Sequence, residues 1–163
     1  MAVKNPSFFQ DTAEQRTTDQ TGRALDALAL TVTGAAIEER LLPANKINLT
    51  AGTFPFFSQK KAETSIAGSN SLIAGMRATA RCTVSDVRFT DTVTITSTGN
   101  VTYVNCRFDT QVVVEAGGKA AFTNCHFVAN VSNAGGPANV GIIGCYRAGA
   151  VHVNCTIIFE QVP

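Results

Sequence analysis

Apolar and polar residues follow a short pattern in the second half of the chain, and this pattern recurs at a nearly constant spacing. It reads Tyr-Val-Asn-Cys-Arg-Phe at residues 103–108 and Phe-Thr-Asn-Cys-His-Phe at residues 122–127. Weaker copies occupy residues 84–89, 142–147 and 152–157. The fourth position of the five copies falls at residues 87, 106, 125, 145 and 155, so the steps are 19, 19, 20 and 10 residues. A repeat of this length with short strands predicts a solenoid.

Further strand candidates keep the same spacing, since Val93–Ile95 corresponds to Val112–Val114 and Gly99 to Gly118. Apolar residues alternate with polar ones along each strand, so one side of every strand faces a core. The predicted fold class is all-β, a short parallel β-helix with 19 to 20 residues per coil. A β-sandwich would require the aligned copies to be coincidental. A doubly wound α/β fold would require helices between the strands, and none is indicated.

Stacked coils place equivalent residues above one another, about 4.8 Å apart. We therefore expect an aromatic ladder of Phe89, Phe108 and Phe127. The neighbouring slot holds Val87, Cys106, Cys125 and Cys145. Four of the five cysteines, Cys106, Cys125, Cys145 and Cys155, take the fourth position of the phrase, and no pair has zinc-knuckle spacing, so we interpret them as buried free thiols. A disulfide and a metal site are the less favoured alternatives.

Asp86, Asn105 and Asn124 fall at the bend of the repeat, where we expect the left-handed backbone conformation that asparagine tolerates. The aromatic-x-Asn-Cys-x-Phe phrase resembles those of right-handed parallel β-helix proteins of the pectin-lyase-like kind, over roughly residues 77–160. The resemblance implies a right-handed solenoid with an interior asparagine ladder. It implies no single function, because such helices serve in lyases, adhesins and viral fibres. Gly144 and Arg147 depart from the phrase, so we expect a shortened or differently looped final coil.

The chain divides into three predicted parts. Residues 1–45 form an attachment arm, either mostly extended or with short helices, that has too few apolar residues for a core of its own. Residues 46–76 form a transition or cap segment, in which three aromatic residues surround Pro55. Residues 77–163 form the parallel β-helix.

Charged residues make up only 15% of the chain, and the net charge is +1. Phosphate binding needs concentrated positive charge, so we expect no nucleic-acid partner. No apolar run approaches the roughly 20 residues of a membrane-spanning helix, and we expect no membrane partner. The first residues lack the apolar stretch of a secretory signal, which predicts production in a cytoplasm. No cofactor or metal is expected.

Carbohydrate hydrolysis on such a scaffold needs paired carboxylates on an external face. The acidic candidates within the repeat are Asp86, Asp91, Asp109 and Glu115. Asp91 and Asp109 do not occupy matching slots, and a few coils offer only a short groove, so we expect no enzyme. His126 is predicted to point outward beside an inward Cys125, which is a poor geometry for a catalytic dyad.

Outward slots of the repeat carry apolar residues, which suggests a partner surface. We expect an oligomer face at Val104, Thr123, Ile143 and Val153, and a homo-oligomer, with a trimer of side-by-side solenoids favoured. Arg88, Arg107, His126 and Tyr146 are expected to form a second external ladder.

A small solenoid of low charge behind a polar arm resembles a bacteriophage virion protein, and its size resembles a capsid decoration (cement) protein. The expected partner is the major capsid protein or another virion protein, and the expected location is the virion, after synthesis in the host cytoplasm. Residues expected to attach the arm are Phe8, Phe9, Leu25, Leu28, Ile37 and Leu42. A glycan-binding tail or head fibre is the main alternative, and a polysaccharide-degrading β-helix enzyme is a weaker one.

Overall fold

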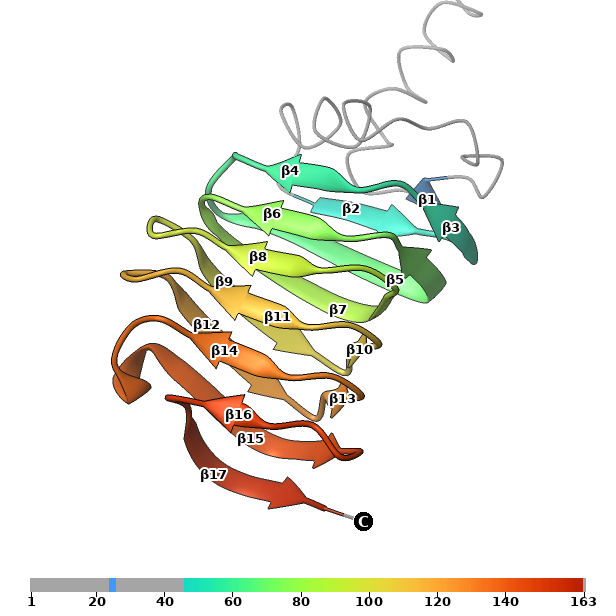
Figure 1. Cartoon of the computed structure of the whole chain (residues 1–163). Helices are drawn as coiled ribbons and strands as arrows, with labels where there is room; N and C mark the ends of the chain where they lie inside the picture. The colour runs from blue at the N-terminus through green and yellow to red at the C-terminus, as the bar shows by residue number, and fades with distance from the viewer. Residues whose placement is uncertain (1–23, 26–45, 163) are drawn as a thin grey trace, which may run out of the picture.

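The computed structural model describes residues 24–25 and 46–162 (Figure 1). These residues form a parallel β-solenoid of about six turns, which confirms the predicted fold class. Each complete coil contributes strands to two sheets that face one another across a single core (Figure 1). No helix among these residues is long and apolar enough to cross a membrane.

The larger sheet, sheet A, contains eleven strands among the described residues, and every pairing in it is parallel. The strands are β1 (Ala24–Leu25), β2 (Lys46–Leu49), β3 (Gly52–Phe54), β5 (Thr64–Ile73), β7 (Arg81–Phe89), β9 (Asn100–Val104), β10 (Arg107–Phe108), β12 (Lys119–Thr123), β13 (His126–Phe127), β15 (Val140–Arg147) and β17 (Thr156–Gln161). Sheet A bends within each coil, so one coil contributes either one long strand or two short ones.

The smaller sheet, sheet B, contains one strand per coil and is also parallel. Its strands are β4 (Phe57–Gln59), β6 (Met76–Ala78), β8 (Val93–Ile95), β11 (Val112–Val114), β14 (Val131–Asn133) and β16 (His152–Val153). A 3-10 turn, η2 (Pro137–Asn139), precedes β15.

The register of the strands reproduces the sequence period. Tyr103 of β9 pairs with Phe122 of β12, 19 positions later. Phe122 in turn pairs with Ile142 of β15, 20 positions later. Equivalent residues therefore lie in ladders along the solenoid, as the repeat predicts.

The solenoid begins earlier than the expected boundary at residue 77. Lys46 pairs with Ser65 and Phe57 with Met76, so the segment expected to be transitional already forms coils with a 19-residue step. The sequence hides this because Ser71 takes the cysteine slot and Ile73 the phenylalanine slot. Burial still alternates along β2 and β4, which places both strands on the common core.

The bend residues adopt the predicted left-handed conformation. Asp86, Asn105 and Asn124 have φ angles of 57°, 52° and 51°, and Gly144 in the fourth copy has a φ of 61°. Glycine replaces asparagine there because both accept positive φ values. Nδ2 of Asn105 donates a hydrogen bond to Oδ1 of Asp86 at 3.3 Å. These side chains are exposed, so the ladder lies on the surface. The interior ladder that the resemblance implies is therefore wrong for this chain.

The aromatic ladder fills the middle of the core. The rings of Phe89 and Phe108 stack at 5.3 Å, and those of Phe108 and Phe127 at 5.2 Å. A second stack beside the first consists of Tyr103 and Phe122, whose ring centroids also lie 5.2 Å apart. Tyr103 meets Phe108 of the first stack edge to face. Both arrangements are favourable for aromatic rings, and such contacts add about 0.5–1.5 kcal/mol each beyond the burial of area.

The cysteine ladder is also in the core, as predicted. Cys106, Cys125 and Cys145 are buried, and all five cysteines of the chain are free thiols. The Sγ atoms of these three donate to backbone carbonyl groups, such as Cys106 Sγ to Val84 O at 3.5 Å. Cys155 is only half-buried, because no complete coil follows it among the described residues.

Candidate functional site

Most residues expected to attach the arm, namely Phe8, Phe9, Leu28, Ile37 and Leu42, lie outside the described residues. Leu25 belongs to β1, whose backbone pairs in parallel with β2 opposite Leu49. The chain that precedes Lys46 thus adds a short strand to the first coil of the solenoid.

The fold places three of the four residues of the expected oligomer face next to one another. Val104, Thr123 and Ile143 form one outward ladder on sheet A, and Phe159 extends it by one coil. Val153 lies on sheet B instead, opposite Ser132. The prediction for Val153 was wrong because the last two copies of the phrase are only 10 residues apart. This short step places the start of the last copy on sheet B.

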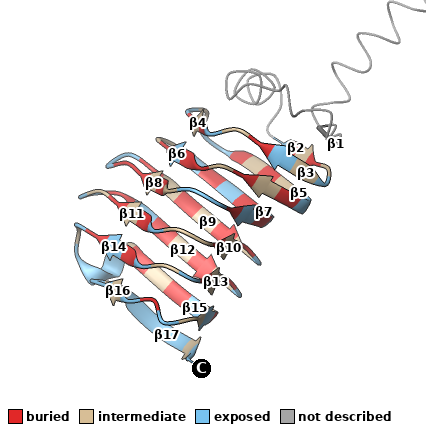
Figure 2. Cartoon of the chain, turned by 45° about the vertical axis from the view of Figure 1, so that its right-hand side comes forward, coloured by how far each residue is buried: buried red, intermediate tan, exposed pale blue. Residues whose placement is uncertain are grey.

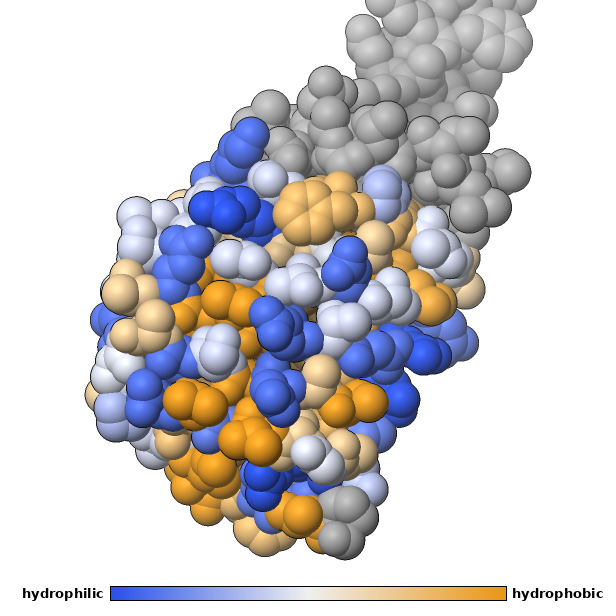
Figure 3. Space-filling view, in the orientation of Figure 1, coloured by the Kyte–Doolittle hydropathy of each residue, from blue (hydrophilic) through white to orange (hydrophobic). Residues whose placement is uncertain are grey.

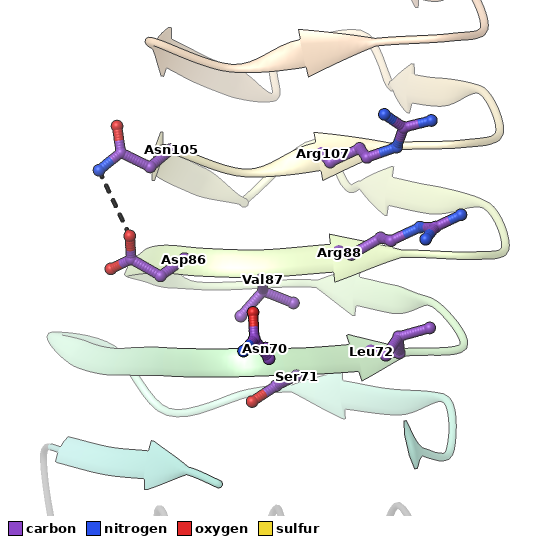
Figure 4. Close-up of a pocket in the computed structure, with 8 residues that line it drawn as sticks. All are labelled: Asn70, Ser71, Leu72, Asp86, Val87, Arg88, Asn105 and Arg107. Atoms are coloured by element: carbon purple, nitrogen blue, oxygen red, sulfur yellow. Dashed lines mark hydrogen bonds between the residues drawn. The ribbon is translucent and has the colours of Figure 1, made fainter. Parts of the chain in front are cut away.

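A shallow recess of about 400 Å³ lies on the outer side of sheet A, across β5, β7 and the β9–β10 bend (Figure 4). Its lining residues are Asn70, Ser71, Leu72, Asp86, Val87, Arg88, Asn105 and Arg107. In Figure 4, Asp86 and Asn105 stand at one end of the recess, and the two arginines stand at the other.

The recess exists because two neighbouring coils have bends of different length. In β5, residues 68–70 occupy the bend between Ala67 and Ser71, whereas β7 uses Asp86 alone. Gly68 permits the close approach of the two bends, since a Cβ atom there would collide with the carbonyl oxygen of Asp86. The hydroxyl of Ser71 donates to Thr50 O at 2.7 Å, which anchors the longer bend on the coil before it.

The arginine end of the recess is an ion-pair network. Nε of Arg88 lies 2.6 Å from one carboxylate oxygen of Asp109, and Nε of Arg107 lies 2.7 Å from the other. Desolvation raises the pKa of Asp109, but the hydrogen bonds and the charges of Arg107 and Arg88 together outweigh it, so the pKa lies below its usual value. Asp109 is therefore held ionised, which is the opposite of what a general acid requires.

The predicted ladder of Arg88, Arg107, His126 and Tyr146 is confirmed by the strand register. Nη1 of Arg107 lies 3.2 Å from Nδ1 of His126, and the His126 ring meets Tyr146 edge to face at 4.6 Å. Because a guanidinium only donates, Nδ1 of His126 accepts this hydrogen bond. Partial burial, together with the charge of Arg107, lowers the pKa of His126.

The other candidate carboxylates have structural partners. Oδ1 of Asp91 accepts a hydrogen bond from the backbone N–H of Thr92 at 2.6 Å. Glu115 accepts a hydrogen bond from the N–H of Ser97 and pairs with Arg77 at 3.5 Å. Cys125 is buried, whereas His126 faces outward, as the sequence predicted. Within the described part of the chain, no group of three or more His, Cys, Asp or Glu residues could hold a metal ion.

The recess can therefore bind by hydrogen bonding. It combines a carboxylate, two amides and two guanidinium groups, and the charges of Arg88 and Arg107 are balanced by Asp86 and Asp109. Such a surface suits neutral groups that both donate and accept hydrogen bonds, such as hydroxyls.

The C-terminal end of the solenoid is a second candidate surface, which sequence reasoning missed. Six large hydrophobic residues are exposed within residues 151–162: Val151, Val153, Ile157, Ile158, Phe159 and Val162. The signal in the sequence is the run of three apolar residues from Ile157 to Phe159, which breaks the alternation of the earlier strands. This surface is named the C-terminal apolar end.

A comparison of the chain with protein-family models, with curated proteins and with solved structures found no match.

Proposed function

We propose that this chain is a non-enzymatic structural protein of a bacteriophage virion, a capsid decoration protein that binds the assembled shell through its N-terminal arm and projects the solenoid. The observation that carries the proposal is that the rod has two unlike ends. The chain before Lys46 enters at one end through β1, and the C-terminal apolar end lies at the other (Figure 1). A rigid rod with an attachment segment at one end is suited to structural attachment.

The physical basis of decoration is preferential binding. A protein that binds the assembled shell and not its free subunits stabilises the shell by mass action. The arm offers Phe8 and Phe9 as an apolar anchor within a polar segment. Burial of one phenylalanine side chain contributes about 1.5–3 kcal/mol, so two such residues supply useful affinity.

Self-association of the solenoid belongs to the same proposal. The prediction of a side-by-side trimer rests on four outward positions, Val104, Thr123, Ile143 and Val153, sharing one face. Val153 lies on sheet B, which leaves three of these positions on one ladder. The trimer therefore remains a prediction with fewer residues to support it.

The test uses purified full-length protein and density-purified particles from the host that carries this gene. Cosedimentation is measured for the natural protein, for the double variant Phe8→Ser/Phe9→Ser and for Phe56→Ser, a matched substitution at an exposed residue of the solenoid. We expect the double variant to bind at least about tenfold more weakly and the control to bind normally. Equal binding by the double variant refutes attachment through the arm, and no binding by the natural protein refutes the decoration proposal.

A second candidate function, glycan binding by a fibre, is favoured by one observation, the neutral hydrogen-bonding recess at Asp86 and Asn105. A glycan array decides between the two. Reproducible binding that is lost in Asn105→Gly, which keeps the bend but removes the amide, supports the fibre. An array without hits removes this candidate.

A further inference from the structure

The two ends of one core ladder differ in their exposure. The ladder consists of residues that pair in register along sheet A: Ile47, Ile66, Val84, Tyr103, Phe122, Ile142 and Ile157. Ile157, at the C-terminal end, is 46% exposed, whereas Ile47, at the opposite end, is 0% exposed. Figure 2 shows β17 exposed along nearly its whole length, and Figure 3 shows hydrophobic side chains on the surface towards that end. The N-terminal end of the core is therefore covered, unlike the C-terminal end.

The described strands cover only part of this N-terminal end. β1 pairs with β2 on sheet A, and on sheet B no strand of the described residues precedes β4. Phe57 of β4 is nevertheless 1% exposed, and Gln59 is 0% exposed. Because these exposures are those of the isolated chain, the cover on β4 comes from residues of this chain that precede Lys46.

The path of the chain indicates which of these residues provide the cover. β1 and β2 run parallel, so the chain must return from Leu25 to Lys46 through a crossover connection. In the later coils, this return includes a strand of sheet B. Ala24 pairs with Asn48, a step of 24 residues, which is somewhat longer than the 19-residue step from Lys46 to Ser65. Residues 26–45 thus have the length to cross the end of the core, and both of their ends are fixed beside it.

The composition of residues 26–45 also suits this position. They include six large hydrophobic residues: Leu28, Leu30, Val32, Ile37, Leu41 and Leu42. Residues 10–23 contain none, so Phe8 and Phe9 are separated from β1 by a polar stretch. Burial of apolar side chains against the open end of a core is favourable, and only the segment between β1 and β2 offers several of them beside that end.

We propose that residues 26–45 pack on the N-terminal end of the solenoid core and that their apolar side chains cover Ile47 and Phe57. The attachment arm is then confined to residues 1–23, with Phe8 and Phe9 as its aromatic residues. Leu28, Ile37 and Leu42 belong to the solenoid in this arrangement and not to the surface that binds a partner. The inference goes beyond the proposed function and does not depend on it, because the packing is a property of the isolated protein.

Limited trypsin digestion of the natural full-length protein is the first test. Arg16 lies in the arm and Arg40 in the segment proposed to pack. Each cleavage rate is compared with that of a synthetic peptide that contains the same site, which removes the effect of neighbouring residues on trypsin. We expect cleavage after Arg40 to be at least about tenfold slower than in its peptide, because a packed segment must open first, and cleavage after Arg16 to match its peptide. Cleavage after Arg40 at the rate of its peptide overturns the proposal, and equal suppression after Arg16 overturns the boundary of the arm.

Hydrogen exchange of full-length variants is the second test. Ile37→Ser/Leu42→Ser removes apolar side chains from the proposed cover, and Phe8→Ser/Phe9→Ser is the matched change in the arm. We expect the first variant to exchange the amides of β2 and β4 at least about tenfold faster than the natural protein, while those of β11 keep their protection and show that the solenoid is folded. The second variant should exchange like the natural protein. Unchanged exchange in Ile37→Ser/Leu42→Ser overturns the proposal, and faster exchange of β4 in Phe8→Ser/Phe9→Ser assigns the cover to the arm instead.

Discussion

Nε of Arg147 lies 3.2 Å from Oε2 of Glu160 at the C-terminal end of the core. Arg147 pairs in register with Phe127, so a charged residue occupies the ladder position that phenylalanine holds one coil earlier. His152 completes the cluster, since its ring is buried, lies 2.6 Å from Glu160 and meets Phe127 edge to face at 4.9 Å. The aromatic core is thus closed by a polar cluster and not by another apolar coil.

Breaking this cluster should destabilise the protein. Glu160→Gln removes the negative charge beside Arg147 and His152, and we expect a loss of about 2 kcal/mol in the free energy of unfolding. The matched control is Glu63→Gln, because Glu63 and Arg81 pair on the open surface, where such pairs contribute little. Urea denaturation measures both variants. Equal losses in the two proteins would contradict the structural role of the cluster.

The stability of the protein should fall on mild acidification. Burial lowers the pKa of His152 below its usual 6.5, and the opposing effect of Glu160 does not reverse this. The folded state therefore binds this proton less readily than the unfolded state does. The contribution of His152 is present above pH 6.5 and is lost as pH falls through its lowered folded-state pKa.

Thermal melts between pH 7.5 and pH 5 measure this effect on the full chain. His126 also has a lowered pKa and acts in the same direction, so His126→Gln/His152→Gln should show a flatter pH profile than the natural protein. A double variant with an unchanged slope would assign the pH dependence to other groups.

Removal of one ring from the aromatic stack should be costly. Phe108 is fully buried between Phe89 and Phe127, and Phe108→Ala should cost about 3–5 kcal/mol. Phe56→Ala, at an exposed ring in the first coil, should cost less than about 1 kcal/mol. The free energy of unfolding of each variant checks this, and similar costs for the two would contradict the stacked core.

The bends should prefer glycine to alanine. Asn105 has a φ of 52°, so Asn105→Ala forces an ordinary residue into the left-handed region at a cost of about 1–2 kcal/mol. Asn105→Gly keeps the conformation and should cost less, although it also removes the hydrogen bond to Asp86. If alanine is tolerated better than glycine in denaturation experiments, the bend does not have this conformation.

The sequence predicted those parts of the fold in which equivalent slots repeat the same residue types. Asn105 and Cys106 return 19 positions later as Asn124 and Cys125, so the period and the bend could be predicted. The coils before residue 77 could not be predicted from the repeated phrase, because Ser71 and Ile73 fill its cysteine and phenylalanine positions with other residue types. A core position requires a side chain of suitable size that can be buried, and several residue types meet this requirement.

The surface features could not be predicted in the same way. The recess depends on the mismatch between a three-residue bend in β5 and Asp86 alone in β7, which a search for equal repeats does not register. The exposure of Ile158 and Phe159 depends on whether another coil follows them, which their own residue types do not specify. Val153 shows that a shifted repeat step can move a residue to the other sheet.

The most direct test of the proposed virion role is quantitative mass spectrometry across a density gradient of particles from the host that carries this gene. We expect peptides of this chain to peak in the particle fractions at a constant ratio to the major capsid protein. Recovery of the chain only among soluble proteins at the top of the gradient would contradict it.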